Sequence, residues 1–158
     1  MKKPSTPHDP PSTPHPHPHA HVNVNVNAHE SEPSPRVGPF LHEKLDAYQV
    51  AREMADLAGK IAKLVPRGHR NVADHMLRAA SNAVLLLAEG ANRRGAGEKR
   101  QRFVESRGEC GEVGAAGDLL IAFEIGGRAD AERLKRLAAR VSAMLTRLIG
   151  RLDGMGPL

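Results

Sequence analysis

The stretch that decides the fold runs from Asp74 to Asp118 and reads DHMLRAASNAVLLLAEGANRRGAGEKRQRFVESRGECGEVGAAGD. It contains two segments in which apolar and small residues recur at steps of three and four, the spacing of one face of an α-helix. A turn rich in Gly and Arg joins them, and the most apolar run, Ala83–Ala88, lies in the first. The pattern predicts two helices packed against each other, around which the rest of the folded chain is arranged.

The whole chain favours an all-α fold. Its only aromatic residues are three Phe and one Tyr, and its apolar residues are mainly Ala, Leu and Val, which suit close helix packing. Four helical segments are expected, over residues 40–64, 71–90, 96–125 and 129–152. We therefore predict an antiparallel up-down-up-down four-helix bundle over residues 40–152, with a frayed C-terminus over residues 153–158.

Residues 1–39 are dense in Pro, His, Ser, Thr and Asn and nearly lack large apolar side chains. Burial of so little apolar surface cannot offset a backbone ordering cost of about 1–2 kcal/mol per residue, so this segment is predicted to be a disordered low-complexity tail. Its alternating histidines could bind Zn²⁺, Ni²⁺ or Cu²⁺, or could be compositional drift, which we favour because no carboxylate fixes the imidazoles. These residues are His15, His17, His19 and His21.

Each helical segment has an expected buried seam. In residues 40–64 the seam is Leu41, Leu45, Tyr48, Ala51 or Arg52, Ala55, Ala58, Ala62 and Val65. In residues 71–90 it is Val72, Met76, Ala79, Ala83, Leu86 and Gly90. In residues 96–125 it is Phe103, Ser106, Cys110, Val113, Gly117, Leu120 and Glu124. In residues 129–152 it is Leu134, Leu137, Val141, Leu145, Leu148 and Leu152.

The second helical segment carries more apolar residues than one bundle can cover. Outside its seam, Val84, Leu85 and Leu87 make the helix apolar nearly all round. A helix of this kind needs a second partner, so these three residues predict an interface between subunits. The alternative is a broad apolar stripe covered by the stems of neighbouring Arg and Lys side chains.

Four glycines follow one another at every third residue of the third segment, at Gly108, Gly111, Gly114 and Gly117. Each costs about 0.5–1 kcal/mol against Ala inside a helix. They predict either a kink or fraying of this helix, or a close contact between its backbone and the first or second helix.

Basic residues form two groups, and the formal net charge of +5 arises outside the first 39 residues, where acidic and basic residues cancel. The group at the turn consists of Arg93, Arg94, Lys99, Arg100 and Arg102. The group on the last helix forms a stripe at helical spacing, made of Arg133, Arg136, Arg140, Arg147 and Arg151. Guanidinium groups bind phosphate oxygens in a forked geometry, so both groups predict nucleic-acid binding; a solvated basic face is the equal alternative.

No catalytic residue or cofactor is predicted. A di-iron site in a bundle needs Glu-x-x-His pairs, which are absent from the sequence. The carboxylates of Glu105, Glu109 and Glu112 share a side of one helix but are expected to be solvated or ion-paired, and Cys110 is expected in the core. The single cysteine and the lack of a signal-peptide pattern or long apolar run favour a cytoplasmic protein that does not span a membrane.

The quoted stretch resembles a bacterial four-helix bundle family. That family includes the proteins encoded by intervening sequences of large-subunit rRNA genes and the accessory protein of diversity-generating retroelements. The resemblance lies in Arg78-Ala79-Ala80 followed by Ala88-Glu89-Gly90, a basic turn, Phe103, Arg107-Gly108 with Glu112, and an earlier Tyr48-Gln49 pair. The chain departs from it at Leu86, where family members often have Asn, and at Glu109, where they have Ser.

The resemblance covers residues 40–152 and implies a homo-oligomer, with a pentamer as the expected form, and no catalytic activity. Its retroelement branch further implies binding to nucleic acid and to a reverse transcriptase. The leading hypothesis is a non-enzymatic oligomeric scaffold that binds RNA or DNA. The alternatives are a protein–protein interaction module without nucleic-acid binding, and an enzyme or metal protein that uses the helical carboxylates or the His-rich tail.

Overall fold

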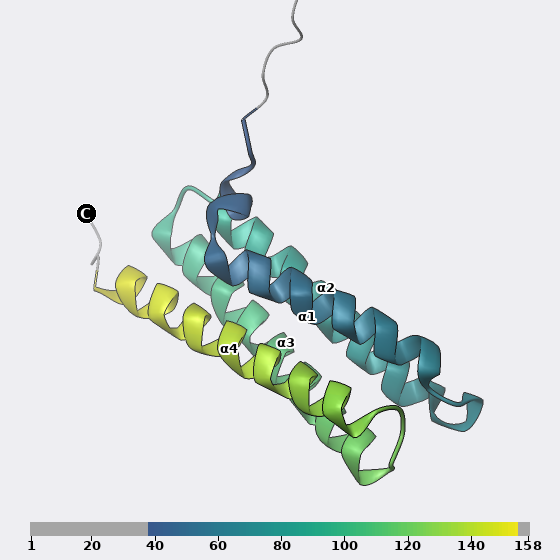
Figure 1. The fold of residues 1–158 in the computed structure, drawn as a ribbon. Coiled ribbons are helices and arrows are strands. Elements are labelled where there is room, and N and C mark those ends of the chain that lie inside the picture. Colours follow the sequence, from purple (N-terminus) through teal and green to yellow (C-terminus); the bar gives the residue numbers. More distant parts are fainter. Residues whose placement is uncertain (1–37, 155–158) are drawn as a thin grey trace, which may run out of the picture. The chain divides into compact units, whose positions relative to one another are not determined.

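The structure is a computed structural model that describes residues 38–154, and these form a bundle of four α-helices preceded by a short 3-10 helix (Figure 1). The elements are η1 (Leu41–Lys44), α1 (Asp46–Leu64), η2 (Arg67–His69), α2 (Arg70–Asn92), α3 (Ala96–Ala122) and α4 (Arg128–Asp153). The predicted all-α fold is therefore confirmed. Residues 1–37 of the predicted disordered tail, including the histidines for which metal binding was the less favoured alternative, and residues 155–158 of the predicted frayed terminus lie outside the described residues.

Each helix packs antiparallel to its neighbours. Contacts between α2 and α3 run in opposite chain directions, from Arg78 with Glu112 to Asn82 with Glu109. Between α3 and α4 the same is true of Arg100 with Asp153 and Arg107 with Thr146. Within the described residues α1 contacts α2 and α4, and α3 contacts α2 and α4, whereas neither diagonal pair is in contact. The helices thus occupy the corners of a square in chain order.

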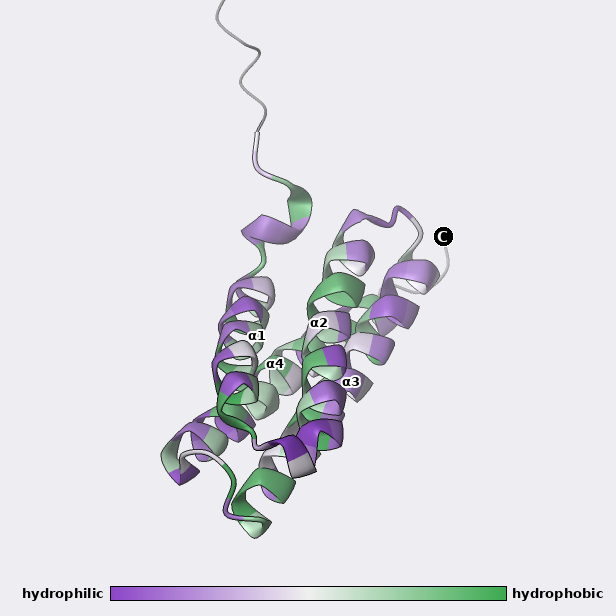
Figure 2. Cartoon of the chain, turned by 90° about the vertical axis from the view of Figure 1, so that its right-hand side faces the viewer, coloured by the Kyte–Doolittle hydropathy of each residue, from purple (hydrophilic) through white to green (hydrophobic). Residues whose placement is uncertain are grey.

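The pair α2 and α3 packs through small residues. Ala79, Ala80 and Ala83 of α2 are buried, and the hydroxyl of Ser106 on α3 donates a hydrogen bond of 2.7 Å to the carbonyl oxygen of Ala83. A Cβ atom on Gly90 would lie 2.6 Å from the ring of Phe103, so only glycine fits there. Apolar residues gather where the helices face one another (Figure 2).

The first helical segment differs from its prediction in two ways. Leu45 has an extended backbone, with φ −92° and ψ 122°, and it divides the expected single helix into η1 and α1. The residues around this break interact with one another: the side-chain amide of Gln49 donates to the carbonyl oxygen of Glu43, and His42 contacts the edge of Tyr48. The predicted seam began at Leu41, and this start is wrong because the side chain of Leu41 is 55% exposed.

The buried seam of α1 follows its larger apolar residues instead. Of the predicted residues, Leu45, Tyr48 and Ala55 are only half-buried and Arg52 is exposed, whereas Ala51, Ala58, Ala62 and Val65 are buried as expected. The other buried positions of α1 are Ala47, Val50, Met54, Leu57 and Ile61. Alanines occur on several sides of this helix, so they cannot orient it, whereas burial of Met54 and Ile61 removes far more apolar surface from water.

The seams of α2 and α4 differ from prediction near one end. In α2 the buried leucine is Leu87, and Leu86 is half-buried, because the seam advances from Ala83 by four residues instead of three. In α4, Leu148 and Leu152 are half-buried and Ile149 takes the buried position, while Leu134, Leu137, Val141 and Leu145 are buried as predicted.

Helix α3 is continuous through all four glycines, so the predicted kink is absent. Gly117 makes a close contact, but with α4 and not with either of the first two helices as predicted. A Cβ atom there would lie 2.6 Å from Cγ of Lys135 and 3.3 Å from the carbonyl oxygen of Ala131. Gly108, Gly111 and Gly114 instead face open space. The predicted seam of α3 is buried from Phe103 to Leu120, and its last predicted residue, Glu124, is not.

That last member, Glu124, is exposed because α3 ends earlier than expected. The amide of Ile125 donates to the carbonyl oxygen of Leu120, and the amide of Glu124 donates to that of Ile121. This pair of bonds is a Schellman motif, which requires a left-handed residue at the position of Glu124, where φ is 54°. The chain then turns again at Gly126, with φ 69°.

We predict opposite effects from alanine at two kinds of glycine. Gly108→Ala and Gly111→Ala should each raise the free energy of unfolding by about 0.5–1 kcal/mol, because the new methyl groups meet nothing and the unfolded chain loses freedom. Gly90→Ala should lower it by about 1–3 kcal/mol by displacing Phe103. Urea denaturation of the three variants measures both effects, and a loss of stability in Gly108→Ala would contradict the open position of that glycine.

A second prediction concerns the end of α3. Glu124→Gly should raise the free energy of unfolding by up to about 1 kcal/mol, because glycine adopts positive φ without steric cost. Gly126→Ala is the matched control, and it should lower stability by about 1 kcal/mol or more. Thermal unfolding followed by circular dichroism separates the two variants, and equal melting temperatures would contradict the left-handed turn.

Candidate nucleic-acid interface

Acidic neighbours largely neutralise the basic group at the α2–α3 turn. Glu89 accepts a hydrogen bond from Arg93 and also lies 3.2 Å from Nε of Arg102. Arg102 further binds Glu105 at 2.5 Å, and Arg100 binds Asp153 at 2.5 Å. Of the five predicted cations, only Arg94 and Lys99 have no ion pair with a described residue.

The pKa shifts of Arg102 and Glu105 agree with these ion pairs. The hydrogen bond to Glu105 is the main reason that the pKa of Arg102 is raised. The pKa of Glu105 is lowered, first by a hydrogen bond from Gln101 and then by that from Arg102. Three of the five predicted cations at this turn are therefore ion-paired and less available for phosphate.

The stripe on α4 is different. All five arginines are exposed, and at 100° per residue they lie within an arc of about 60°, on the side of the helix away from its buried seam. They extend over about 27 Å at 1.5 Å per residue. From Arg133 to Leu152 the chain contains no Asp or Glu, so no acidic residue of the same helix interrupts the stripe.

Pairing with other helices is limited along the stripe. Arg133 binds Glu53 of α1 at 2.7 Å. Arg136, Arg140, Arg147 and Arg151 form no ion pair with any residue between 38 and 154. We therefore place the strongest candidate site for a polyanion on α4, centred on Arg136 and Arg140.

The carboxylates of α3 are engaged with basic or amide groups. Besides the Glu105 pair, Glu109 accepts a hydrogen bond of 3.1 Å from the side chain of Asn82, and Glu112 lies 3.6 Å from Arg78. Residues 38–154 contain no group of three metal-ligating side chains close enough to hold one ion. Within the described residues Glu105 and Glu112 are therefore ion-paired, and Glu109 is hydrogen-bonded to an amide.

Cys110 is buried in the core as predicted. Burial is the main reason that its pKa rises to about 12, and the charge of Glu109 adds to the effect. The thiolate is therefore strongly disfavoured at neutral pH, whereas the thiolate is the reactive form of cysteine.

The three residues predicted at a subunit interface lie in three different environments. Leu85 is 66% exposed, the most exposed large apolar side chain of the described residues. Val84 is half-buried against the core. Leu87 is 0% exposed, so its placement on an outer face was wrong, because the seam of α2 passes through it.

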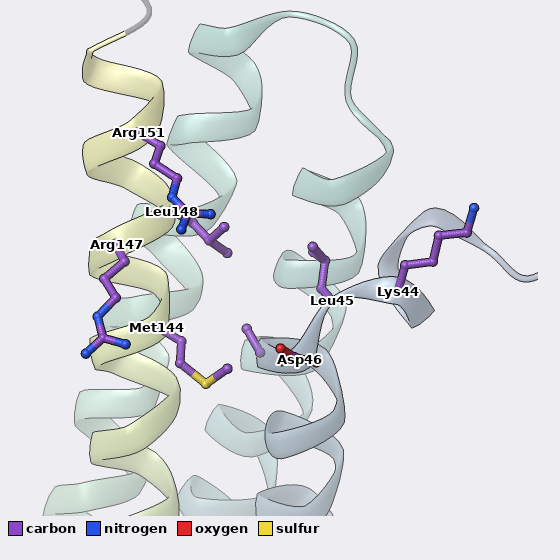
Figure 3. Close-up of a pocket in the computed structure, with 8 residues that line it drawn as sticks. Lys44, Leu45, Asp46, Met144, Arg147, Leu148 and Arg151 are labelled. Carbon is purple, nitrogen blue, oxygen red and sulfur yellow. The ribbon is translucent and has the colours of Figure 1, made fainter.

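Sequence reasoning missed one part of the basic surface. Lys44 of η1 and Asp46 of α1 line a groove of about 280 Å³ together with Arg147 and Arg151 of α4 (Figure 3). The groove exists because the chain breaks at Leu45 and brings the start of α1 beside the end of α4. An expected unbroken helix over residues 40–64 gave no reason to look for it.

The described residues thus define a protein of the helical-bundle class with an arginine-lined outer helix and no helix long and apolar enough to cross a membrane. The model of the family described as 23S rRNA-intervening sequence protein matches residues 43–147, more than half of the chain, and the protein belongs to that family. The resemblance inferred from the central stretch is confirmed. Comparison with curated proteins gives no significant match.

We predict that Cys110 resists alkylation in the folded protein. A pKa of about 12 lowers the thiolate fraction near pH 8 by roughly 10³-fold relative to an unperturbed thiol, and the packed core also excludes the reagent. Treatment with iodoacetamide followed by mass spectrometry should show modification only in denaturant. Rapid modification of folded protein, with circular dichroism unchanged, would contradict the buried position.

Proposed function

We propose that this protein is a non-enzymatic, homo-oligomeric helical scaffold that binds nucleic acid along α4. The observation that carries the proposal is the run of exposed arginines that have no acidic partner on their own helix. A guanidinium pays a smaller dehydration cost than an ammonium and contacts two phosphate oxygens at once.

Recognition by this surface should depend on the backbone and not on the sequence of the nucleic acid. The stripe consists of arginines on a straight helix, and aromatic side chains for base stacking are absent from the exposed face of α4. Contacts of that kind position a protein on phosphates but carry little base information. Binding should therefore weaken steeply with salt, since each neutralised phosphate releases counterions.

The scaffold role includes protein partners. The first is the protein itself, with the pentamer implied by the family resemblance as the expected assembly. The second is a reverse transcriptase, which applies if the chain belongs to the retroelement branch. Co-purification of such an enzyme with the intact protein after nuclease treatment would support this second partner.

The nucleic-acid proposal is tested by reversing two charges. Arg136→Glu/Arg140→Glu should weaken binding to single-stranded RNA and duplex DNA by about tenfold or more and reduce the slope of log K against log salt by about 1.4–1.8. Fluorescence anisotropy at several salt concentrations measures both quantities. Arg133 is left unchanged because its substitution would remove the ion-pair partner of Glu53.

The matched control is Arg67→Glu/Arg70→Glu, which makes the same change in net charge at exposed positions of η2 and the start of α2. This variant should keep the affinity of the unmodified protein within a few-fold. Equal losses in both variants would show that only net charge matters. Absence of salt-sensitive binding by the unmodified protein would overturn the proposal.

The alternative is a protein–protein interaction module without nucleic-acid binding. The exposure of Leu85 favours it, because an isolated leucine beside ionic side chains suits a polypeptide partner better than a phosphate backbone. A defined protein partner that stays bound after nuclease treatment, together with no affinity for RNA or DNA, would select this alternative.

A further inference from the structure

Two grooves lie on opposite edges of the square formed by the four helices. The acidic groove, of about 440 Å³, lies between α2 and α3 and is lined by Leu85, Leu86, Glu89, Arg102, Glu105 and Glu109. The basic groove, of about 280 Å³, lies between α1 and α4 and is lined by Lys44, Asp46, Met144, Arg147, Leu148 and Arg151 (Figure 3). Because the edge between α1 and α4 is opposite that between α2 and α3, the two grooves face away from each other.

The two grooves are complementary in charge. Three glutamates and Arg102 line the acidic groove, where Glu89 and Glu105 are ion-paired with arginines and Glu109 has no ion pair with a described residue. In the basic groove three cations face one carboxylate. Groups of opposite sign that meet across an interface steer association and select its orientation. Neither groove matches a second copy of itself, because like charges would meet there.

The grooves are also complementary in apolar surface. Leu85 is 66% exposed at the acidic groove, beside the half-buried Leu86. Met144 and Leu148 are half-buried on the wall of the basic groove, and Figure 3 shows the side chain of Met144 directed toward α1. An apolar side chain that inserts between such residues supplies affinity, whereas the charges around it mainly supply specificity.

The grooves lie at the same height along the bundle. Ser106 of α3 bonds to Ala83 of α2, and the next residue, Arg107, donates to the hydroxyl of Thr146 on α4 at 3.3 Å. Ala83 lies within one turn of Leu85, and Thr146 lies next to Arg147. One level of the bundle therefore passes through both grooves.

Equal height has a consequence for assembly. When one surface binds a different surface of the next copy, a shift along the axis produces an open helical filament, whereas rotation alone allows a closed ring. Copies joined through grooves at equal height stand side by side with little shift. Equal height therefore removes the shift that would produce a helical filament, and closure into a ring additionally requires the two interfaces of one copy to be inclined to each other.

We propose that the acidic groove of one copy binds the basic groove of a second copy, with Leu85 inserted toward Met144 and Leu148. This inference rests on the proposed homo-oligomer and names the surfaces that would form it. It assigns Arg147 and Arg151 to the contact between copies and leaves Arg136 and Arg140 to nucleic acid. The two parts of the α4 stripe would then have separate roles.

The test is a charge exchange followed by light scattering on the full chain at micromolar concentration. Glu109→Arg and Arg147→Glu should each convert the oligomer to monomers, because each places like charges opposite one another. The double variant Glu109→Arg/Arg147→Glu should recover assembly. Leu85→Glu should dissociate the oligomer through loss of the apolar contact and is not expected to be rescued.

Asp74→Arg and Arg67→Glu are the matched controls, with the same changes of charge at exposed positions near the other end of the bundle. Both should keep the mass of the unmodified assembly, and circular dichroism should show that every variant is folded. A monomeric unmodified protein would overturn the homo-oligomer and this interface together. An oligomer that persists in Glu109→Arg, Arg147→Glu and Leu85→Glu would overturn the interface alone.

Discussion

The close approach of α2 and α3 is the constraint on which the rest of the bundle depends. Gly90 lies against the ring of Phe103, where any side chain would collide, and the hydroxyl of Ser106 is fully buried against the carbonyl oxygen of Ala83. A buried hydroxyl without an acceptor costs about 1–3 kcal/mol, so a shift of one helix along the other would be unfavourable. These contacts fix both the distance between the two helices and their register.

That register determines where the charged surfaces lie. Arg107, one residue after Ser106, contacts Thr146, so the position of α4 follows from that of α3. Burial of Leu134, Val141 and Leu145 then turns the arginines of α4 outward. On the opposite edge, glutamates of α3 and Glu89 of α2 surround Leu85. The bundle consequently has an acidic edge and a basic edge.

The arginine stripe of α4 has two parts with different neighbours. Arginines near the C-terminal end of α4 lie beside the start of α1, where Lys44 and Asp46 complete a groove. Arginines nearer the middle of α4 have no such neighbour in the described residues and remain open to a polyanion. The difference comes from the neighbouring helix, since these arginines lie on one side of α4 along its whole length.

The sequence by itself determined the number of α-helices, the approximate bounds of α2 and α4 and the seam of α3 from Phe103 to Leu120. Phe103, Val113 and Leu120 recur at helical spacing on one side of α3 and are buried. It did not determine which side of α1 is buried, because alanines lie around much of its circumference. It also did not determine the end of α3, because no sequence pattern indicates that Glu124 adopts a left-handed backbone conformation. Tertiary structure decided that Arg100 pairs with Asp153 and Arg133 with Glu53, while the other four arginines of the α4 stripe form no ion pair within the described residues. The pairs of Arg93 with Glu89 and of Arg102 with Glu105 follow helical spacing. Pairs between helices depend on which side chains meet there, and spacing along a single helix cannot specify that.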